Sequence, residues 1–146
     1  MENSVVNRII LVLEPNPDYA QLIERTLREN AIPHSVAAIA DGEEAIAYLR
    51  RHGPYKDAPR PDLVLLDLNL PGKNGWEILA EMKADPQLRR IPTIVLTLSE
   101  AEEDIVRSYA LQSNCYVVKS SDLEQLSQTV ARIREFWLRI VTLPVQ

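Results

Sequence analysis

The sequence predicts a doubly wound α/β fold, in which helices cover both faces of one parallel sheet. Short apolar runs alternate five times with longer segments of helical spacing, which favours parallel strands joined by right-handed crossover helices. The runs at 9–13, 63–66 and 93–96 are apolar at nearly every position. Strands that are buried on both faces have this pattern, and such strands are typical of parallel sheets.

Five strands and five helix starts follow one another along the chain. The predicted strands are residues 9–13, 35–39, 63–66, 93–96 and 116–118. After the first strand, Asn16 is a capping residue placed directly before Pro17, which suits the first helical position. The other four starts pair a capping side chain with a glutamate three residues later: Asp41 with Glu44, Asn74 with Glu77, Ser99 with Glu102, and Ser121 with Glu124.

We expect one domain at residues 8–135 and a C-terminal extension at 136–146. The Pro-rich connection at 53–61 is too short to link two domains. Helical spacing continues from Leu123 to Val141, and a helix of ~19 residues would be ~28 Å long. Because this exceeds what one short strand needs, we expect Phe136, Trp137 and Ile140 to overhang the sheet, exposed, as a dimerisation arm. The alternative is that the segment folds back on its own core.

Composition excludes several classes of function. The 146 residues include 16 basic and 21 acidic side chains, and the net charge of −5 argues against binding to nucleic acid. A single cysteine, Cys115, rules out a disulfide framework and a thiolate metal cluster. No apolar run has the roughly 20 residues of a membrane span, and the N-terminus is not a secretory signal. We therefore expect a cytoplasmic protein with no nucleic-acid or membrane partner.

Polar side chains close four of the predicted strands. Glu14, Asp67, Thr97 and Lys119 follow the first, third, fourth and fifth strands, and the carboxyl ends of parallel strands form the ligand-binding edge of such a sheet. Two carboxylates ~4 Å apart at an effective dielectric of ~20 repel by about 4 kcal/mol, and a divalent cation such as Mg²⁺ removes this repulsion. A carboxylate beside a cation can be a nucleophile toward phosphorus, while a hydroxyl and an ammonium hold the transferred oxygens.

Five segments together resemble the receiver domain of two-component response regulators. They are LVLEPNP at 11–17, DGEEAIAYL at 41–49, PDLVLLDLNLPGKNGWE at 61–77, PTIVLTLSE at 92–100 and CYVVKS at 115–120. The stretches SEAEEDIVRSYALQSNCYVVKS and EFWLRIVTLP are similar to stand-alone receivers partnered with phytochrome-type histidine kinases. This resemblance implies a flavodoxin-like five-stranded sheet in the order 2-1-3-4-5.

The resemblance also implies roles for single residues. Asp67 would accept a phosphoryl group from a kinase phosphohistidine, and the output face would lie on the fourth helix, fifth strand and fifth helix. The remaining roles divide as follows: Glu14, Asp67 and the backbone carbonyl of Asn69 for Mg²⁺, Thr97 and Lys119 for the phosphoryl oxygens, and Tyr116 for the aromatic switch.

Three positions depart from the family pattern. Pro15 stands where receivers carry a second acid, Leu98 where a small residue follows the threonine, and Ser120 where a proline follows the lysine. Since proline offers no anionic oxygen, we expect a weakened Mg²⁺ site. The alternative function is therefore a degenerate receiver that acts as a binding module without efficient phosphorylation.

We do not favour an enzymatic function. A phosphatase with an aspartate nucleophile usually has a second aspartate two positions on, where Asn69 stands here. The four glycines form no phosphate-cradling loop, which disfavours a flavin-binding module.

Overall fold

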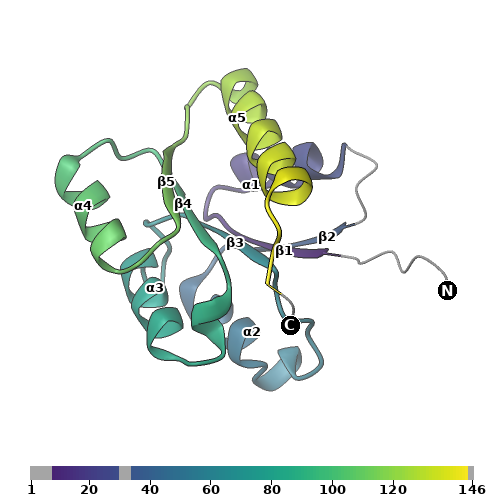
Figure 1. Ribbon diagram of the computed structural model, residues 1–146, viewed down its shortest axis with the longest axis vertical. Coiled ribbons are helices and arrows are strands. Elements are labelled where there is room, and N and C mark those ends of the chain that lie inside the picture. Colours follow the sequence, from purple (N-terminus) through teal and green to yellow (C-terminus); the bar gives the residue numbers. More distant parts are fainter. Residues whose placement is uncertain (1–7, 30–33, 145–146) are drawn as a thin grey trace, which may run out of the picture.

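The computed structural model describes residues 8–29 and 34–144, and it shows one sheet with helices on both sides (Figure 1). Five parallel strands lie in the order β2-β1-β3-β4-β5. They are β1 (Arg8–Leu13), β2 (His34–Ile39), β3 (Leu63–Leu66), β4 (Thr93–Thr97) and β5 (Cys115–Val118). The predicted fold class and strand order are confirmed.

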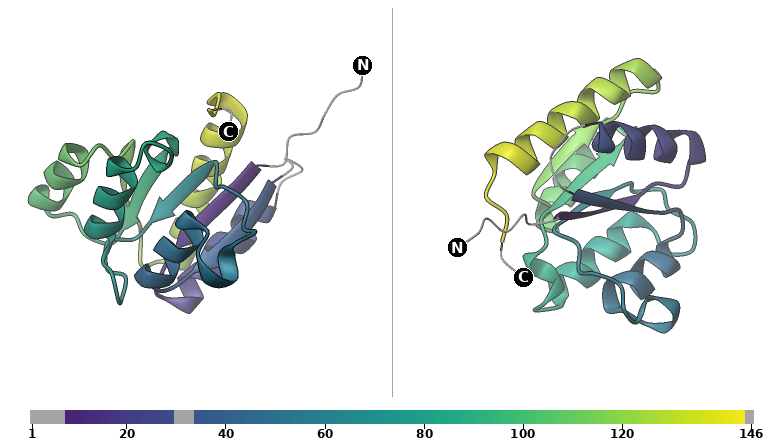
Figure 2. Two further views of the ribbon diagram at one scale, coloured as in Figure 1. Left: turned by 90° about the horizontal axis from the view of Figure 1, so that it is seen from below. Right: turned by 90° about the vertical axis from the view of Figure 1, so that its right-hand side faces the viewer.

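Helices form the two outer layers of the fold. They are α1 (Pro17–Arg28), α2 (Gly42–Arg50), α3 (Gly75–Ala84), α4 (Glu102–Ala110) and α5 (Leu123–Glu135), with short 3₁₀ helices η1 (Gly53–Tyr55) and η2 (Leu88–Arg90). Figure 2 shows α1 and α5 on one side of the sheet and α2 and α3 on the other. Within the described residues, no helix is both long and apolar enough to cross a bilayer.

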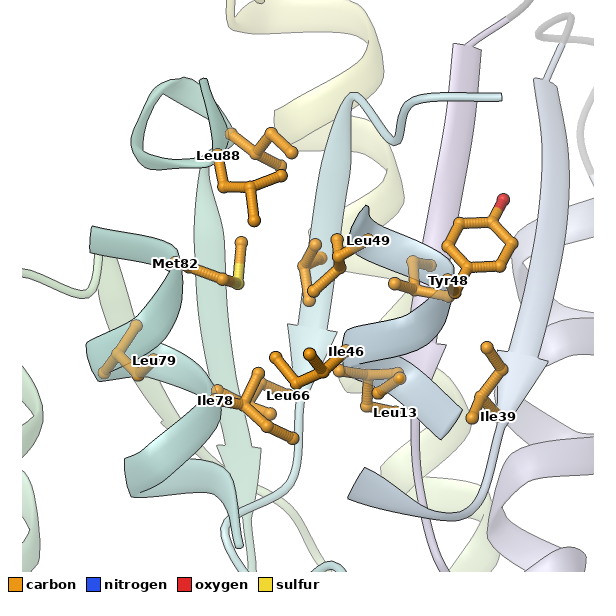
Figure 3. Close-up of a cluster of buried hydrophobic side chains, with 14 of the residues drawn as sticks. Leu13, Ile39, Ile46, Tyr48, Leu49, Leu66, Ile78, Leu79, Met82 and Leu88 are labelled. Atoms are coloured by element: carbon orange, nitrogen blue, oxygen red, sulfur yellow. The ribbon is translucent and has the colours of Figure 1, made fainter. Parts of the chain in front are cut away.

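Each face of the sheet packs against its helices through a separate apolar cluster. Leu13 and Leu66 meet Ile78 and Met82 of α3 on one face (Figure 3). The opposite face contacts α1 and α5 through residues that include Ile23 and Val130, and all four residues of β3 are buried. Burial on both faces explains why the central strands are apolar throughout.

Three of the predicted helix starts are confirmed. Asn16 caps α1 by accepting the N–H groups of Asp18 and Tyr19, and Asp41 caps α2. Asn74 and Glu77 form the reciprocal capping box at α3.

The other two predicted caps are wrong by one or two residues. The N-cap of α4 is Ala101, because the Ser99 hydroxyl is used inside the preceding loop, where it accepts from Ala101 N–H and donates to Asp104. The N-cap of α5 is Asp122 rather than Ser121, since its carboxylate accepts two N–H groups of the first turn. A charged acceptor makes the stronger cap.

The predicted C-terminal helix continues nearly to its expected end, but its last five residues are π-helical. α5 ends at Glu135, and a π-helical segment, η3 (Phe136–Ile140), follows. Trp137 packs partly buried against the α1–α5 cluster, and Leu143 is buried. Phe136 and Ile140 are 49% and 70% exposed, as expected for an overhang. Trp137 and Leu143 are covered while Phe136 and Ile140 are exposed, so the tail packs in part against its own domain.

Candidate functional site

The four side chains predicted to converge lie at the carboxyl edge of the sheet. Backbone hydrogen bonds fix their places: Glu14 N–H donates to Ile39, Asp67 N–H to Leu13 at 3.0 Å, and Lys119 N–H to Thr97 at 2.8 Å. Glu14, Asp67, Thr97 and Lys119 are all buried. The register of the parallel strands thus brings residues from four separate strand ends to one edge.

Lys119 bridges the two carboxylates of the site. Its Nζ donates to Oδ2 of Asp67 at 2.6 Å and to Oε1 of Glu14. The other oxygens are occupied by backbone donors, since Asp67 Oδ1 accepts from Asn69 N–H at 2.7 Å and Glu14 Oε2 accepts from Asn16 N–H at 3.0 Å. Two buried carboxylates and one ammonium leave the triad with one net negative charge.

Burial raises the pKa of Glu14 above its ordinary value. The hydrogen bonds from Lys119 and from Asn16 N–H favour the ionised form and oppose this rise. The carboxyl of Glu14 therefore depends on Lys119 for its charge.

Thr97 supplies a hydroxyl with no partner. The residue is fully buried, and its Oγ1 has no hydrogen-bond partner in the described part of the chain. An unsatisfied buried hydroxyl is costly, and native structures keep few of them. At the edge that also holds Asp67 and Lys119, it is a donor available to an oxygen of a ligand.

Tyr116 lies beside this edge without contacting the acceptor carboxylate. Its hydroxyl donates to the backbone carbonyl of Ser99 at 2.9 Å, and its N–H donates to the hydroxyl of Tyr109 at 3.2 Å. Burial raises the pKa of Tyr116. The side chain therefore ties β5 to the β4–α4 loop, which begins directly after Thr97.

The oxygen donors of the site suit a hard cation that keeps several waters. Of the positions that the resemblance implies for Mg²⁺, Glu14 and Asp67 carry carboxylates at this edge, while Pro15 has no side-chain oxygen and Asp18 is exposed on α1. Across residues 8–29 and 34–144, no three acidic, histidine or cysteine side chains lie close enough to bind a metal. The two carboxylates suit Mg²⁺ as oxygen ligands, and a bound cation would replace contacts that Lys119 and the backbone now make with them.

A tight loop fixes the backbone that follows Asp67. A Cβ atom at Gly75 would lie 2.6 Å from the carbonyl oxygen of Asp67, which is closer than real contacts permit. Only glycine therefore allows α3 to begin so near the acceptor. Leu98, which the sequence predicted to narrow the entry to Asp67, is 47% exposed. At the other departure from the family pattern, the Ser120 hydroxyl accepts from Asp122 N–H, and the Lys119–Ser120 peptide is trans.

Sequence reasoning missed one member of the site. Lys119 Nζ lies 5.0 Å from the ring centroid of Tyr19 on α1, within the range of a cation–π interaction. An aromatic residue in the first turn after the first strand was the available signal. No spacing rule relates that turn to the residue after β5, so only the fold shows the pairing.

These features define the receiver class of two-component signalling proteins, and the chain belongs to the response regulator receiver domain family, whose match covers residues 10–131. It is 45% identical over 137 residues to the response regulator Rcp1 of Synechocystis sp., covering 94% of this chain and 93% of Rcp1. The crystal structure of the phosphorylated cyanobacterial phytochrome response regulator RcpA is 51% identical with a TM-score of 0.93, covering 96% of this chain and 100% of RcpA. The Mn²⁺-bound form of Rcp1 gives a TM-score of 0.92 at 45% identity, covering 94% and 99% of the two chains.

Proposed function

We propose that this protein is a response regulator that accepts a phosphoryl group on Asp67 from the phosphohistidine of a phytochrome-type histidine kinase. It acts in the cytoplasm, signals through protein contacts without binding nucleic acid, and turns over no separate substrate as an enzyme. The observation that carries the proposal is the buried contact of Asp67 with Lys119 beside the unpartnered hydroxyl of Thr97.

The geometry supports an in-line transfer to Asp67. A carboxylate oxygen of Asp67 attacks phosphorus, the O–P bond forms, and the P–N bond to the kinase imidazole breaks. Lys119 and Thr97 then bind oxygens of the phosphoryl group, since such transfers depend mainly on positioning and charge neutralisation. Mg²⁺ held by Glu14, Asp67 and the Asn69 carbonyl would neutralise part of the incoming charge. With proline at position 15, this cation binds more weakly than in receivers that carry the second acid.

The relatives support both parts of the proposal. The RcpA structure is of a phosphorylated protein, and the Rcp1 structure contains Mn²⁺, another cation that prefers oxygen ligands. A bacteriophytochrome response regulator, RtBRR, is 32% identical with a TM-score of 0.75, covering 97% of this chain and 83% of RtBRR. These names support a light-sensing histidine kinase as the phosphoryl donor.

Transfer from an autophosphorylated phytochrome-type kinase tests the proposal directly. The wild-type protein should gain radiolabelled phosphate in Mg²⁺, and Asp67→Asn should gain none. Asp57→Asn is a matched control, because it makes the same change at an exposed aspartate of the connection before β3. Beryllofluoride binding, followed by fluorine NMR, gives a second measure that does not depend on the choice of kinase.

A phosphorylation-independent binding module is the second candidate function. The contact of Lys119 with Glu14 favours this function, because the Lys119 ammonium already neutralises a carboxylate that would otherwise bind the metal. If the wild-type protein takes up neither phosphate nor beryllofluoride at millimolar Mg²⁺, the acceptor proposal fails and the binding module replaces it.

We also propose that the protein forms a homodimer through the exposed residues of η3. Phe136 and Ile140 present apolar side chains, while Trp137 packs inward. A Phe136→Ser and Ile140→Ser double variant should sediment as a monomer where the wild type sediments as a dimer. The same sedimentation coefficient for both proteins would refute this arm.

A further inference from the structure

A second concave site lies at the amino edge of the sheet, at the opposite end of the strands from Asp67. It is a concave site of about 530 Å³, open to solvent and lined by the end of α2, the connection before β3 and the turn after α3. Leu49 and Leu88 line its base, and both belong to the buried cluster drawn in Figure 3. The apolar base of the site therefore belongs to the core, while most of its polar lining lies on the connections around it.

Three arginines and a histidine line this cavity: Arg50, Arg51, Arg60 and His52. The one acidic lining residue is Asp85, and its Oδ1 accepts the N–H groups of Gln87 and Leu88. The lining is thus cationic in a chain whose net charge is −5.

Two of these guanidinium groups have no carboxylate partner within the described residues. Arg60 donates to the backbone carbonyl of Gln87 at 3.0 Å and to its side-chain Oε1 at 2.8 Å, and both acceptors are neutral. Arg51 makes no ion pair in residues 8–29 and 34–144. Arg50 pairs with Glu81, which Lys73 also contacts. The two neutral acceptors of Gln87 fix the Arg60 side chain without compensating its positive charge.

The backbone at Arg51 decides which substitution can test this side chain. Arg51 ends α2 in the left-handed conformation, with φ of 58°. Glycine adopts this conformation at helix ends without steric cost, and other residues adopt it seldom. Gln112, after α4, has the same conformation with φ of 68°, so this conformation marks a helix end and makes glycine a suitable replacement for Arg51.

We propose that this cavity binds a small molecule that carries two or more phosphate groups. Its volume lies within the range of small-ligand sites, and its open side admits a ligand whose charged groups stay partly hydrated. Guanidinium groups bind phosphate oxygens through paired charge-assisted hydrogen bonds, and Arg51 and Arg60, with no carboxylate partner in the described part of the chain, suit a polyphosphate or a nucleotide. The proposal is independent of phosphoryl transfer to Asp67.

Calorimetric titration with pyrophosphate, without divalent cations and at an ionic strength of about 0.15 M, tests the proposal. We expect saturable binding at one site, and chemical-shift changes in NMR confined to residues 50–52, 60 and 85–88. Arg51→Gly should weaken binding at least about fivefold, because it removes a charged donor, and its fold should persist because glycine suits this backbone. Arg25→Gln on the exposed face of α1 makes a similar change in net charge and should leave the affinity unaltered.

Four results would overturn the proposal: no saturable binding at pyrophosphate concentrations up to about 1 mM, equal weakening by Arg51→Gly and Arg25→Gln, shifts that map outside the cavity, or binding of a polyglutamate peptide in preference to pyrophosphate. The last result would assign the cavity to an acidic protein partner. ATP, titrated in parallel, distinguishes a nucleotide site from a site for inorganic polyphosphate.

Discussion

Replacing Thr97 with valine should make the protein more stable and less active. Oγ1 of Thr97 is fully buried without a partner, and an unsatisfied hydroxyl costs about 1–3 kcal/mol. Valine has the same branched outline and no hydroxyl to desolvate, so we expect a gain of about 1 kcal/mol, at the lower end of that range. For a domain of this size, this gain raises Tm by about 2–4 °C.

The same substitution removes a hydrogen bond to the phosphoryl group. A bond to a charged group is worth about 1.5–3 kcal/mol, so phosphoryl uptake should slow roughly ten- to a hundredfold. Thermal unfolding and a phosphotransfer time course measure the two effects on one preparation.

Thr97→Ser is the matched control, because it keeps the hydroxyl and deletes only a methyl group. It should lose about 1 kcal/mol of stability and retain uptake within a few-fold. If Thr97→Val is no more stable than wild type, the hydroxyl is satisfied in the folded protein. If its uptake is unchanged, Thr97 does not contact the phosphoryl group, and the reasoning fails at that step.

Three further predictions concern Glu14, Asp67 and Lys119 and the residues beside them. Because burial raises the pKa of Glu14, its carboxyl contributes most to the free energy of unfolding below its ordinary pKa of 4.5, and this contribution is lost as pH rises through the folded-state value. Glu14→Gln should abolish this pH dependence, measured by urea unfolding. Identical pH profiles for the variant and the wild type would contradict the prediction. Pro15→Asp should tighten Mg²⁺ binding roughly tenfold by adding an anionic oxygen, and a calorimetric titration with unchanged affinity would place position 15 outside the metal site. In a double-mutant cycle on the free energy of unfolding, Tyr19→Leu and Lys119→Met should show a coupling of about 1–2 kcal/mol, because the ammonium is desolvated. A cycle with Tyr19→Phe in the place of the wild-type tyrosine should keep this coupling. Its loss there would show that the hydroxyl of Tyr19, and not its ring, contacts Lys119.

The positions of the acceptor and its neighbours could be predicted because they depend on strand ends. All four residues of β3 are apolar and buried. Asp67 is the first polar residue after them, and this position marked it as a candidate site residue. The same reasoning placed Thr97 and Lys119, since parallel strands share a carboxyl edge. The pattern that decides which residues are buried is local in sequence, and so the site could be assembled without knowing any contact.

The features that escaped prediction depend on contacts between distant segments. The ring of Tyr19 reaches Lys119 only because α1 and the end of β5 lie at the same edge. Trp137 packs against the cluster beneath α1 and α5, although the length of the helix predicted it to be exposed. Both contacts join segments far apart in the sequence, which no local pattern records.

The contacts of Lys119 suggest how phosphorylation reaches the rest of the domain. On the proposed function, a phosphoryl group adds nearly two negative charges at Asp67, and the ammonium of Lys119 should move toward it and away from Glu14. Glu14, whose pKa burial already raises, then loses the hydrogen bond that most favours its charge. Its other oxygen holds the N–H of Asn16, the cap of α1. The start of α1 should therefore respond together with the β4–α4 loop that Tyr116 contacts, because one ammonium serves both carboxylates.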